Sequence, residues 1–105
     1  MASTSSQMVI SGLQSVTNGI SSAGNYDIIG SLTLPGIANG ASANSQVVTT
    51  VSHNGSPIFT SQAGSEGFTI TNLPCAAGDT ITVALTSAAA VDQGLNVVKC
   101  TVAIG

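Results

Sequence analysis

Hydrophobic and polar residues alternate with a period of two along most of the chain from residue 24 onward. The clearest case is the stretch 79–87, where Ile81, Val83 and Leu85 alternate with three threonines and an alanine. A period of two places successive side chains on opposite faces of a strand, with one face in the core. The same pattern predicts half-buried antiparallel strands in the stretches 25–35, 46–53, 67–73, 79–87 and 96–105.

Turn-forming residues separate these stretches. Asn54 and Gly55 stand between two strand-like runs, and Asn-Gly is the strongest short signal for a β-hairpin, so we expect them at a hairpin tip. Residues 34–45 are rich in Gly and Asn and predict a long turn. In residues 73–79, we expect Asp79 to accept hydrogen bonds from turn N–H groups while Gly78 adopts a positive φ.

With two weaker strands near residues 7–10 and 14–20, the count is about seven or eight strands. The prediction is an all-β fold, an antiparallel β-sandwich or jelly-roll-like barrel. Residues 1–23 are rich in serine and alternate weakly, so we expect a flexible N-terminal arm, partly extended or with weak strands, before a β-sandwich domain at 24–105. Only Ala88 to Asp92 are compatible with a helical turn.

Charged residues make up 5% of the 105 residues, against about 25% in an average soluble domain. The chain carries its polarity instead in 15 Ser, 12 Thr, 7 Asn and 5 Gln. Such a surface has little electrostatic repulsion between copies, which suits a subunit that is covered in an assembly. The charged residues are Asp27, Glu66, Asp79, Asp92 and Lys99.

A single lysine and no arginine exclude the phosphate contacts that nucleic-acid binding requires, and they exclude attraction to anionic membranes. We therefore expect neither nucleic acid nor membrane as a partner. No run of about 18 apolar residues is present, which is the length a transmembrane helix needs. The first 15 residues lack the basic and apolar regions of a secretory signal, so we expect synthesis in a cytosol.

No group of residues forms a catalytic or metal-binding motif. His53 is the only histidine and has no Cys, Asp or Glu near it in sequence, so we expect a solvated turn residue. A simple hairpin of the last two strands would keep Cys75 and Cys100 apart, whereas other strand orders would let them meet. Cys100 lies on an apolar face and is expected in the core. Because CxxC spacing is absent and the carboxylates are dispersed, we expect a non-catalytic protein without metal or cofactor.

Lys99 lies, by alternation, on the face opposite to Cys100. One hypothesis is that a charge on an exposed strand prevents edge-to-edge aggregation. The other is that Lys99 forms a salt bridge to a neighbouring subunit. Asp92 and Glu66 are the acidic residues that we expect in such contacts.

Residues 24–105 contain several segments that resemble small proteins encoded among the structural genes of tailed bacteriophages. These segments are "GNYDIIGSLTLP", "SHNGSPIF", "EGF", "AAGDTI" and "DQGLNVVK". The chain is similar to the capsid decoration (cement) and head-fibre class. This resemblance implies a sandwich or jelly-roll domain that sits on the head shell as a homotrimer and binds the major capsid protein.

The hypothesis is a capsid decoration subunit that stabilises the phage head from outside and is assembled in the bacterial host cytoplasm. One alternative is a tail, baseplate or head-fibre subunit with a host- or glycan-binding tip, formed by the loops at 34–45 and 52–57. A second alternative is a binding module outside viruses, such as a bacterial surface adhesin. An enzyme is the least favoured class, because no two residues of catalytic type share a motif.

Overall fold

The structure is a computed structural model that describes residues 6–33, 47–61, 67–87 and 99–105. All regular elements in these ranges are strands. They are β1 (Ser6–Ser11), β2 (Ser15–Gly19), β3 (Gly24–Thr33), β4 (Val47–His53), β5 (Ser56–Thr60), β6 (Gly67–Cys75), β7 (Thr80–Ser87) and β8 (Lys99–Ile104). The predicted all-β fold is confirmed, with eight strands.

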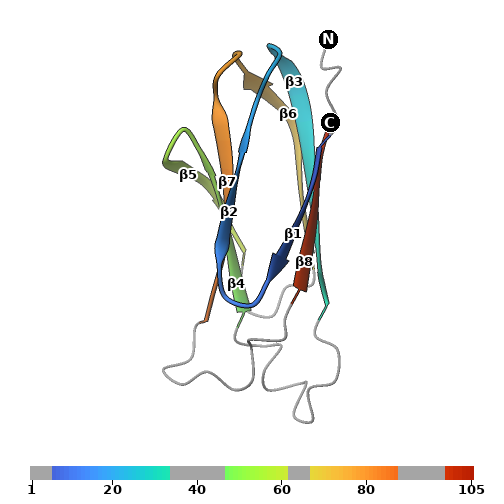
Figure 1. The fold of residues 1–105 in the computed structure, drawn as a ribbon, viewed down its shortest axis with the longest axis vertical. Coiled ribbons are helices and arrows are strands. Elements are labelled where there is room, and N and C mark those ends of the chain that lie inside the picture. The colour runs from blue at the N-terminus through green and yellow to red at the C-terminus, as the bar shows by residue number, and fades with distance from the viewer. Residues whose placement is uncertain (1–5, 34–46, 62–66, 88–98) are drawn as a thin grey trace.

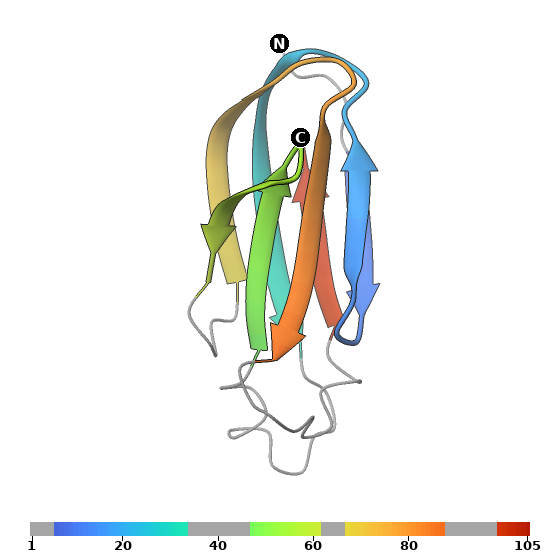
Figure 2. The same ribbon diagram turned by 90° about the vertical axis from the view of Figure 1, so that its left-hand side faces the viewer.

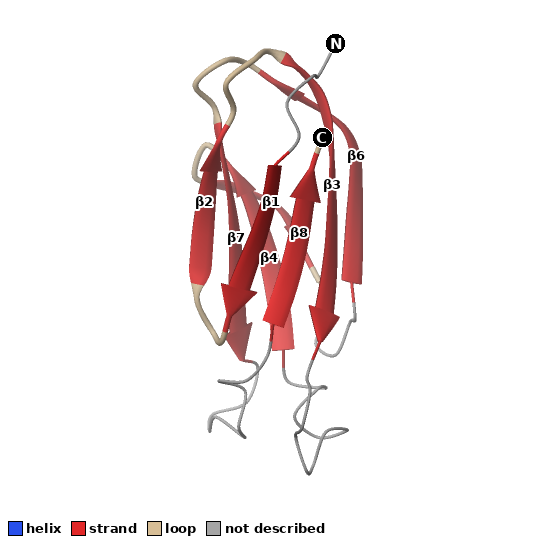
Figure 3. Ribbon diagram, turned by 45° about the vertical axis from the view of Figure 1, so that its right-hand side comes forward, coloured by secondary structure: helices blue, strands red, loops and turns tan. Residues whose placement is uncertain are grey.

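The strands form two four-stranded antiparallel sheets that pack face to face (Figure 1). One sheet has the order β1-β8-β3-β6 and faces the viewer in Figure 3. The other has the order β2-β7-β4-β5 and faces the viewer in Figure 2. The chain changes sheet at every connection except the hairpin between β4 and β5.

The strand pairs are nested around that hairpin. The innermost pair is β4–β5, and the pairs β3–β6, β2–β7 and β1–β8 follow outward. Two further ladders join every second pair of this nested series into a sheet: β3–β8 joins β3–β6 to β1–β8, and β4–β7 joins β4–β5 to β2–β7. Eight strands arranged as a rolled-up hairpin make a jelly roll, so the sheet order selects this form of sandwich among the predicted alternatives.

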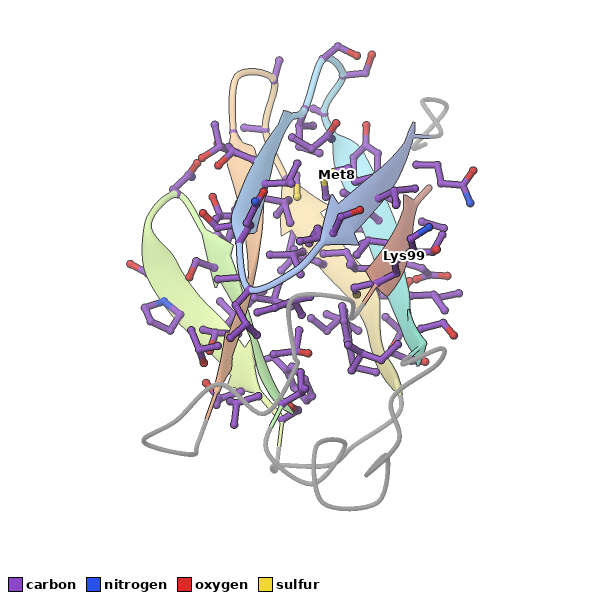
Figure 4. All side chains as sticks on the ribbon, turned by 60° about the horizontal axis from the view of Figure 1, so that its bottom comes forward. Met8 and Lys99 are labelled. Atoms are coloured by element: carbon purple, nitrogen blue, oxygen red, sulfur yellow. The ribbon has the colours of Figure 1, made fainter. Side chains whose placement is uncertain are left out.

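The predicted alternation places the core between the sheets. In β8 the inward residues Cys100, Val102 and Ile104 are buried, whereas Lys99, Thr101 and Ala103 are exposed. Figure 4 shows Met8 between the sheets and Lys99 on the outer side of β8. The core also contains Ile10, Tyr26, Ile28, Val47, Val51, Ile81, Val83 and Leu85.

Residues 6–19 require a correction to the predicted N-terminal arm. The weak strands expected near 7–10 and 14–20 are present as β1 and β2, but each belongs to one of the two sheets. Ile10 is fully buried, and Ile10 pairs with Cys100 in the neighbouring strand. The sandwich therefore begins well before residue 24. Both strands are at sheet edges, where short strands with weak alternation are common.

The hairpin tip at Asn54 and Gly55 is confirmed. Both residues have positive φ, 53° and 84°, which is the geometry of a two-residue type I′ turn. This turn matches the twist of the flanking strands, and Asn and Gly are the residues that tolerate it best.

The edge strands β5 and β6 close one side of the sandwich through aromatic contact. The rings of Phe59 and Phe68 lie 5.5 Å apart at an interplanar angle of 32°. The Phe68 ring also covers Gly30, its partner in β3. A Cβ atom at Gly30 would lie 2.0 Å from the Phe68 ring, so only glycine fits at this position.

Three predictions lie outside the described residues. They are the long turn at 34–45, the position of Glu66, and the helical turn from Ala88 to Asp92.

We expect deletion of residues 102–105 to abolish folding. The deletion removes two fully buried side chains from β8, a strand paired on both sides. Burial of one large aliphatic side chain contributes about 1.5–3 kcal/mol, against a total stability of about 5–15 kcal/mol. Thermal unfolding followed by circular dichroism tests this. A cooperative transition within a few degrees of the full chain would contradict it.

We expect Gly30→Ala to lower the free energy of unfolding by about 1–3 kcal/mol, because the new methyl group overlaps the Phe68 ring. Urea denaturation measures the effect. Gly19→Ala is the matched control, since Gly19 is also in a strand but has no atom within 4 Å of the added Cβ. We expect the control to stay within about 0.5 kcal/mol of the parent chain. Equal effects of both substitutions would contradict the explanation.

Candidate functional site

The roll brings together four residues from two turns, which we call the turn cluster: His53, Asn54, Cys75 and Asp79. His53 and Asn54 come from the β4–β5 hairpin, whereas Cys75 and Asp79 flank the turn between β6 and β7. In Figure 1 the β6–β7 turn lies at the end of the sandwich opposite to the β1–β2 turn.

Backbone and side-chain hydrogen bonds fix the two turns against each other. The Asn54 N–H donates to the Thr80 carbonyl at 2.9 Å. The Thr80 N–H donates in return to Asn54 Oδ1 at 2.9 Å. A third segment joins them, because the Ile20 N–H donates to the Asp79 carbonyl and the Gly78 N–H donates to the Ile20 carbonyl, both at 2.8 Å. The cluster is therefore held on rigid backbone.

Asp79 has the local role that the sequence predicts. Its Oδ2 accepts a hydrogen bond from the Ala76 N–H at 2.9 Å, and Gly78 has a φ of 94°. The same oxygen lies 2.8 Å from His53 Nε2, a contact that sequence spacing does not reveal.

The pKa of Asp79 is lowered from its ordinary 3.8 to about 2. The Ala76 N–H contributes most, and the side chains of Asn54 and then His53 add further hydrogen bonds to the charged form. Burial opposes this only weakly. The Asp79 carboxylate is therefore negatively charged throughout the ordinary pH range.

The His53 side chain differs from the expected solvated turn residue. It is 20% exposed and engages Asp79, so the expectation is wrong. The error has a simple cause: His53 and Asp79 lie 26 residues apart, and only the nesting of the strand pairs brings them together.

Both cysteines are buried free thiols. Burial raises the pKa of the Cys75 thiol, and the negative charge of Asp79 raises it further. Burial likewise raises the pKa of Cys100, although a backbone hydrogen bond from Ser31 partly opposes the shift. A nucleophilic cysteine needs a lowered pKa, so Cys75 beside His53 does not constitute an activated thiol. Cys100 is fully buried in the core, as predicted.

The turn cluster also holds three types of metal-ligating atom. A ring nitrogen of His53, the Cys75 sulfur and a carboxylate oxygen of Asp79 all lie within 4.8 Å of one another. Sequence spacing does not reveal this group, because the three residues form no CxxC or HxxxH motif.

A second feature is the outer surface of the β1-β8-β3-β6 sheet. Its centre is formed by uncharged residues from three strands, and we call it the neutral face. Val9 is 60% exposed and Ile29 is 51% exposed, which makes them conspicuous apolar residues on this surface. Cross-strand pairing places Val9 and Ile29 close together on this surface. Val9 pairs with Thr101, which pairs with Ser31, and Ile29 pairs with Ala103, two residues further along β8. The neutral face consists of Val9, Ile29, Ser31, Thr101 and Ala103.

Lys99 lies at one end of this face and is exposed. Its strand β8 runs between β1 and β3, so it is an interior strand of its sheet. The hypothesis that Lys99 guards a strand edge is therefore wrong. The alternative, contact with a neighbouring subunit, stays a prediction, and its expected partners Glu66 and Asp92 lie outside the described residues.

Within the ranges that the structure describes, no helix has the length and apolar character needed to cross a membrane.

No protein-family model matches the chain, and no curated protein matches it. Solved structures do match. A periplasmic inhibitor of g-type lysozyme from Aeromonas hydrophila, PliG, has a TM-score of 0.50 at 8% identity, covering 97% of this chain and 83% of its own. GITRL from pika has a TM-score of 0.48 at 22% identity, covering 85% of this chain and 71% of its own. Rabbit GITRL has a TM-score of 0.45 at 20% identity, covering 82% of this chain and 68% of its own. At these identities the likeness to PliG concerns the fold alone.

We expect Asp79→Asn to reduce stability most above pH 4 and progressively less toward pH 2. The folded chain binds the Asp79 proton more weakly than the unfolded chain, since the pKa is lowered from 3.8 to about 2. This contribution to stability is therefore present above pH 4 and is lost as pH falls through 2. Melting temperatures of both proteins between pH 2 and 6 test the prediction. A constant gap between the two proteins over this range would contradict it.

Proposed function

We propose that the chain is a capsid decoration subunit of a tailed bacteriophage, a non-catalytic homotrimer that binds the outside of the head shell. The observation that carries the proposal is the neutral face, an exposed sheet surface whose centre has two large aliphatic side chains and no charge. Burying apolar surface without unpaired charge is favourable, whereas burying a lone charge is costly. Such a face is suited to contact with another protein.

The chemistry of the remaining surface supports the same role. The outer side of the β2-β7-β4-β5 sheet is rich in hydroxyl groups, and Thr17 and Thr82 join across its strands at 2.9 Å. Five charged residues in 105 leave little repulsion between copies held close together. In this proposal the neutral faces pack between copies within the trimer.

The resemblance of residues 24–105 to decoration proteins supports the phage head shell as the partner. A shell offers many identical sites, so a trimer that binds through three weak contacts gains strength from avidity. The role is mechanical: the subunit joins neighbouring capsid proteins and resists the pressure of packaged DNA.

We expect Val9→Lys to convert the trimer to a monomer and to weaken binding to empty shells at least about tenfold, because the substitution places an unpaired charge in the buried face. Native mass spectrometry at micromolar concentration measures the oligomer. Cosedimentation with empty head shells of tailed bacteriophages measures binding. Ser15→Lys is the control, since Ser15 is exposed on the opposite sheet.

The two readouts separate the parts of the proposal. A parent chain that stays monomeric would contradict the trimer. A trimer without affinity for shells would contradict the decoration role, as would antibody labelling of the tail instead of the head on intact particles. Equal effects of Val9→Lys and Ser15→Lys would show that the neutral face is not the contact surface.

A further inference from the structure

We propose that His53, Cys75 and Asp79 form a binding site for Zn²⁺ at the end of the sandwich where the β4–β5 and β6–β7 turns meet. The inference goes beyond the decoration role and does not depend on it. It rests on three different ligand types whose donor atoms lie within 4.8 Å of one another.

Small side-chain movements bring the three donor atoms to the spacing of a tetrahedral site. Zinc bonds of about 2.0–2.3 Å place neighbouring ligand atoms about 3.3–3.6 Å apart. His53 Nε2 and Asp79 Oδ2 are closer than this, 2.8 Å, because they share a hydrogen bond. Small rotations of the two partly exposed side chains would therefore open space for an ion between them and the Cys75 sulfur.

The donor set selects the metal. A thiolate and an imidazole bind zinc well, whereas magnesium and calcium require mostly oxygen ligands and larger coordination numbers. One sulfur, one nitrogen and one oxygen from the protein leave the fourth tetrahedral position to a water molecule. When the sulfur–zinc bond forms, the Cys75 thiol gives up its proton to the solvent, and no electron is transferred.

Electrostatics favours a cation at this place. Without an ion, the buried Cys75 sulfur lies close to a carboxylate, so the two groups cannot both carry negative charge at low cost. A divalent cation between them neutralises both charges. The His53 ring then contributes a neutral nitrogen, and its hydrogen bond to Asp79 is replaced by two metal bonds.

The supporting backbone is already in place. The Asn54–Thr80 hydrogen bonds hold the two turns together, and the Ala76 N–H orients the Asp79 carboxylate from the side of its own turn. Such outer contacts determine the direction of ligands and raise metal affinity. A bound ion would in turn join β4 to the end of β6.

Isothermal titration of the untagged, reduced full chain with ZnCl₂ tests the site. We expect one Zn²⁺ per chain, and a melting temperature that rises by several degrees in excess zinc, because the ion binds only the folded chain. We expect His53→Gln to weaken zinc binding about 100-fold, while the fold is kept because His53 lies at a strand end near the surface.

Matched variants identify the ligands. Cys75→Ser should abolish tight binding, whereas Cys100→Ser, the other buried thiol, should not change it. Asp79→Asn should weaken binding, whereas Asp27→Asn should not, although Asp27 also accepts a backbone N–H bond, from Asn72. With CoCl₂ as the probe, a thiolate-to-cobalt charge-transfer band should appear in the parent chain and vanish in Cys75→Ser.

Several results would overturn the proposal. They are no zinc binding with a Kd below about 0.1 mM, binding that survives His53→Gln and Cys75→Ser together, and a preference for MgCl₂ or CaCl₂ over ZnCl₂. If Cys75→Ser fails to fold, the His53→Gln titration and the cobalt spectrum of the parent chain still decide the question.

Discussion

The ladder between β3 and β8 is the interaction on which the rest of the structure depends. It joins the strand pair β1–β8 to the pair β3–β6, and without it the β1-β8-β3-β6 sheet would be two separate ribbons. A two-stranded ribbon is marginally stable in water. The β4–β7 ladder does the same for the other sheet. Only when both ladders exist do the two sheets present continuous apolar faces that can bury each other.

The same nesting creates the turn cluster. Because β4–β7 pairs His53 with Ile81, the residue before the β7 strand must lie beside the tip of the β4–β5 hairpin. Asp79 and Asn54 therefore meet, and each uses its side chain to satisfy a backbone N–H of a turn. The first role of the cluster is structural: its side chains accept the backbone N–H groups left unpaired where the strands end. Its metal-ligating character arises because the residues that end these strands happen to include a histidine and a cysteine.

Much of the fold follows from the sequence, because most strands have one buried and one exposed face. The alternation around Ile81 and Val102 and the Asn54–Gly55 turn depend on neighbouring residues alone, so local reasoning finds them. The role of Asp79 in its own turn is local for the same reason. The alternation in residues 7–20 is weak and interrupted by serine and glycine, so local reasoning predicts an arm where the structure has the short edge strands β1 and β2.

The rest depended on strand order, which alternation does not encode. A guard role for Lys99 against edge-to-edge aggregation requires an edge strand, yet β8 is interior, because β1 adds to the sheet beyond it. His53 looks isolated in the sequence because its partner Asp79 is in the β6–β7 turn, 26 residues further along the chain. In both cases the missing information is which strands are neighbours. That is decided by the summed burial of all the strands, and a short stretch of residues does not contain it.

The nested order of the strand pairs has a consequence for how the chain folds. The hairpin pair His53–Ser56 closes a minimal loop, whereas Ser6 pairs with Ile104 almost at the other end of the chain. Closing a loop costs conformational entropy that grows with its length, and each inner pair shortens the loop left for the next. Assembly that starts at the Asn54–Gly55 tip and proceeds outward is therefore the least costly route. A topology with such distant contacts folds slowly, and on this route the β1–β8 pair forms last.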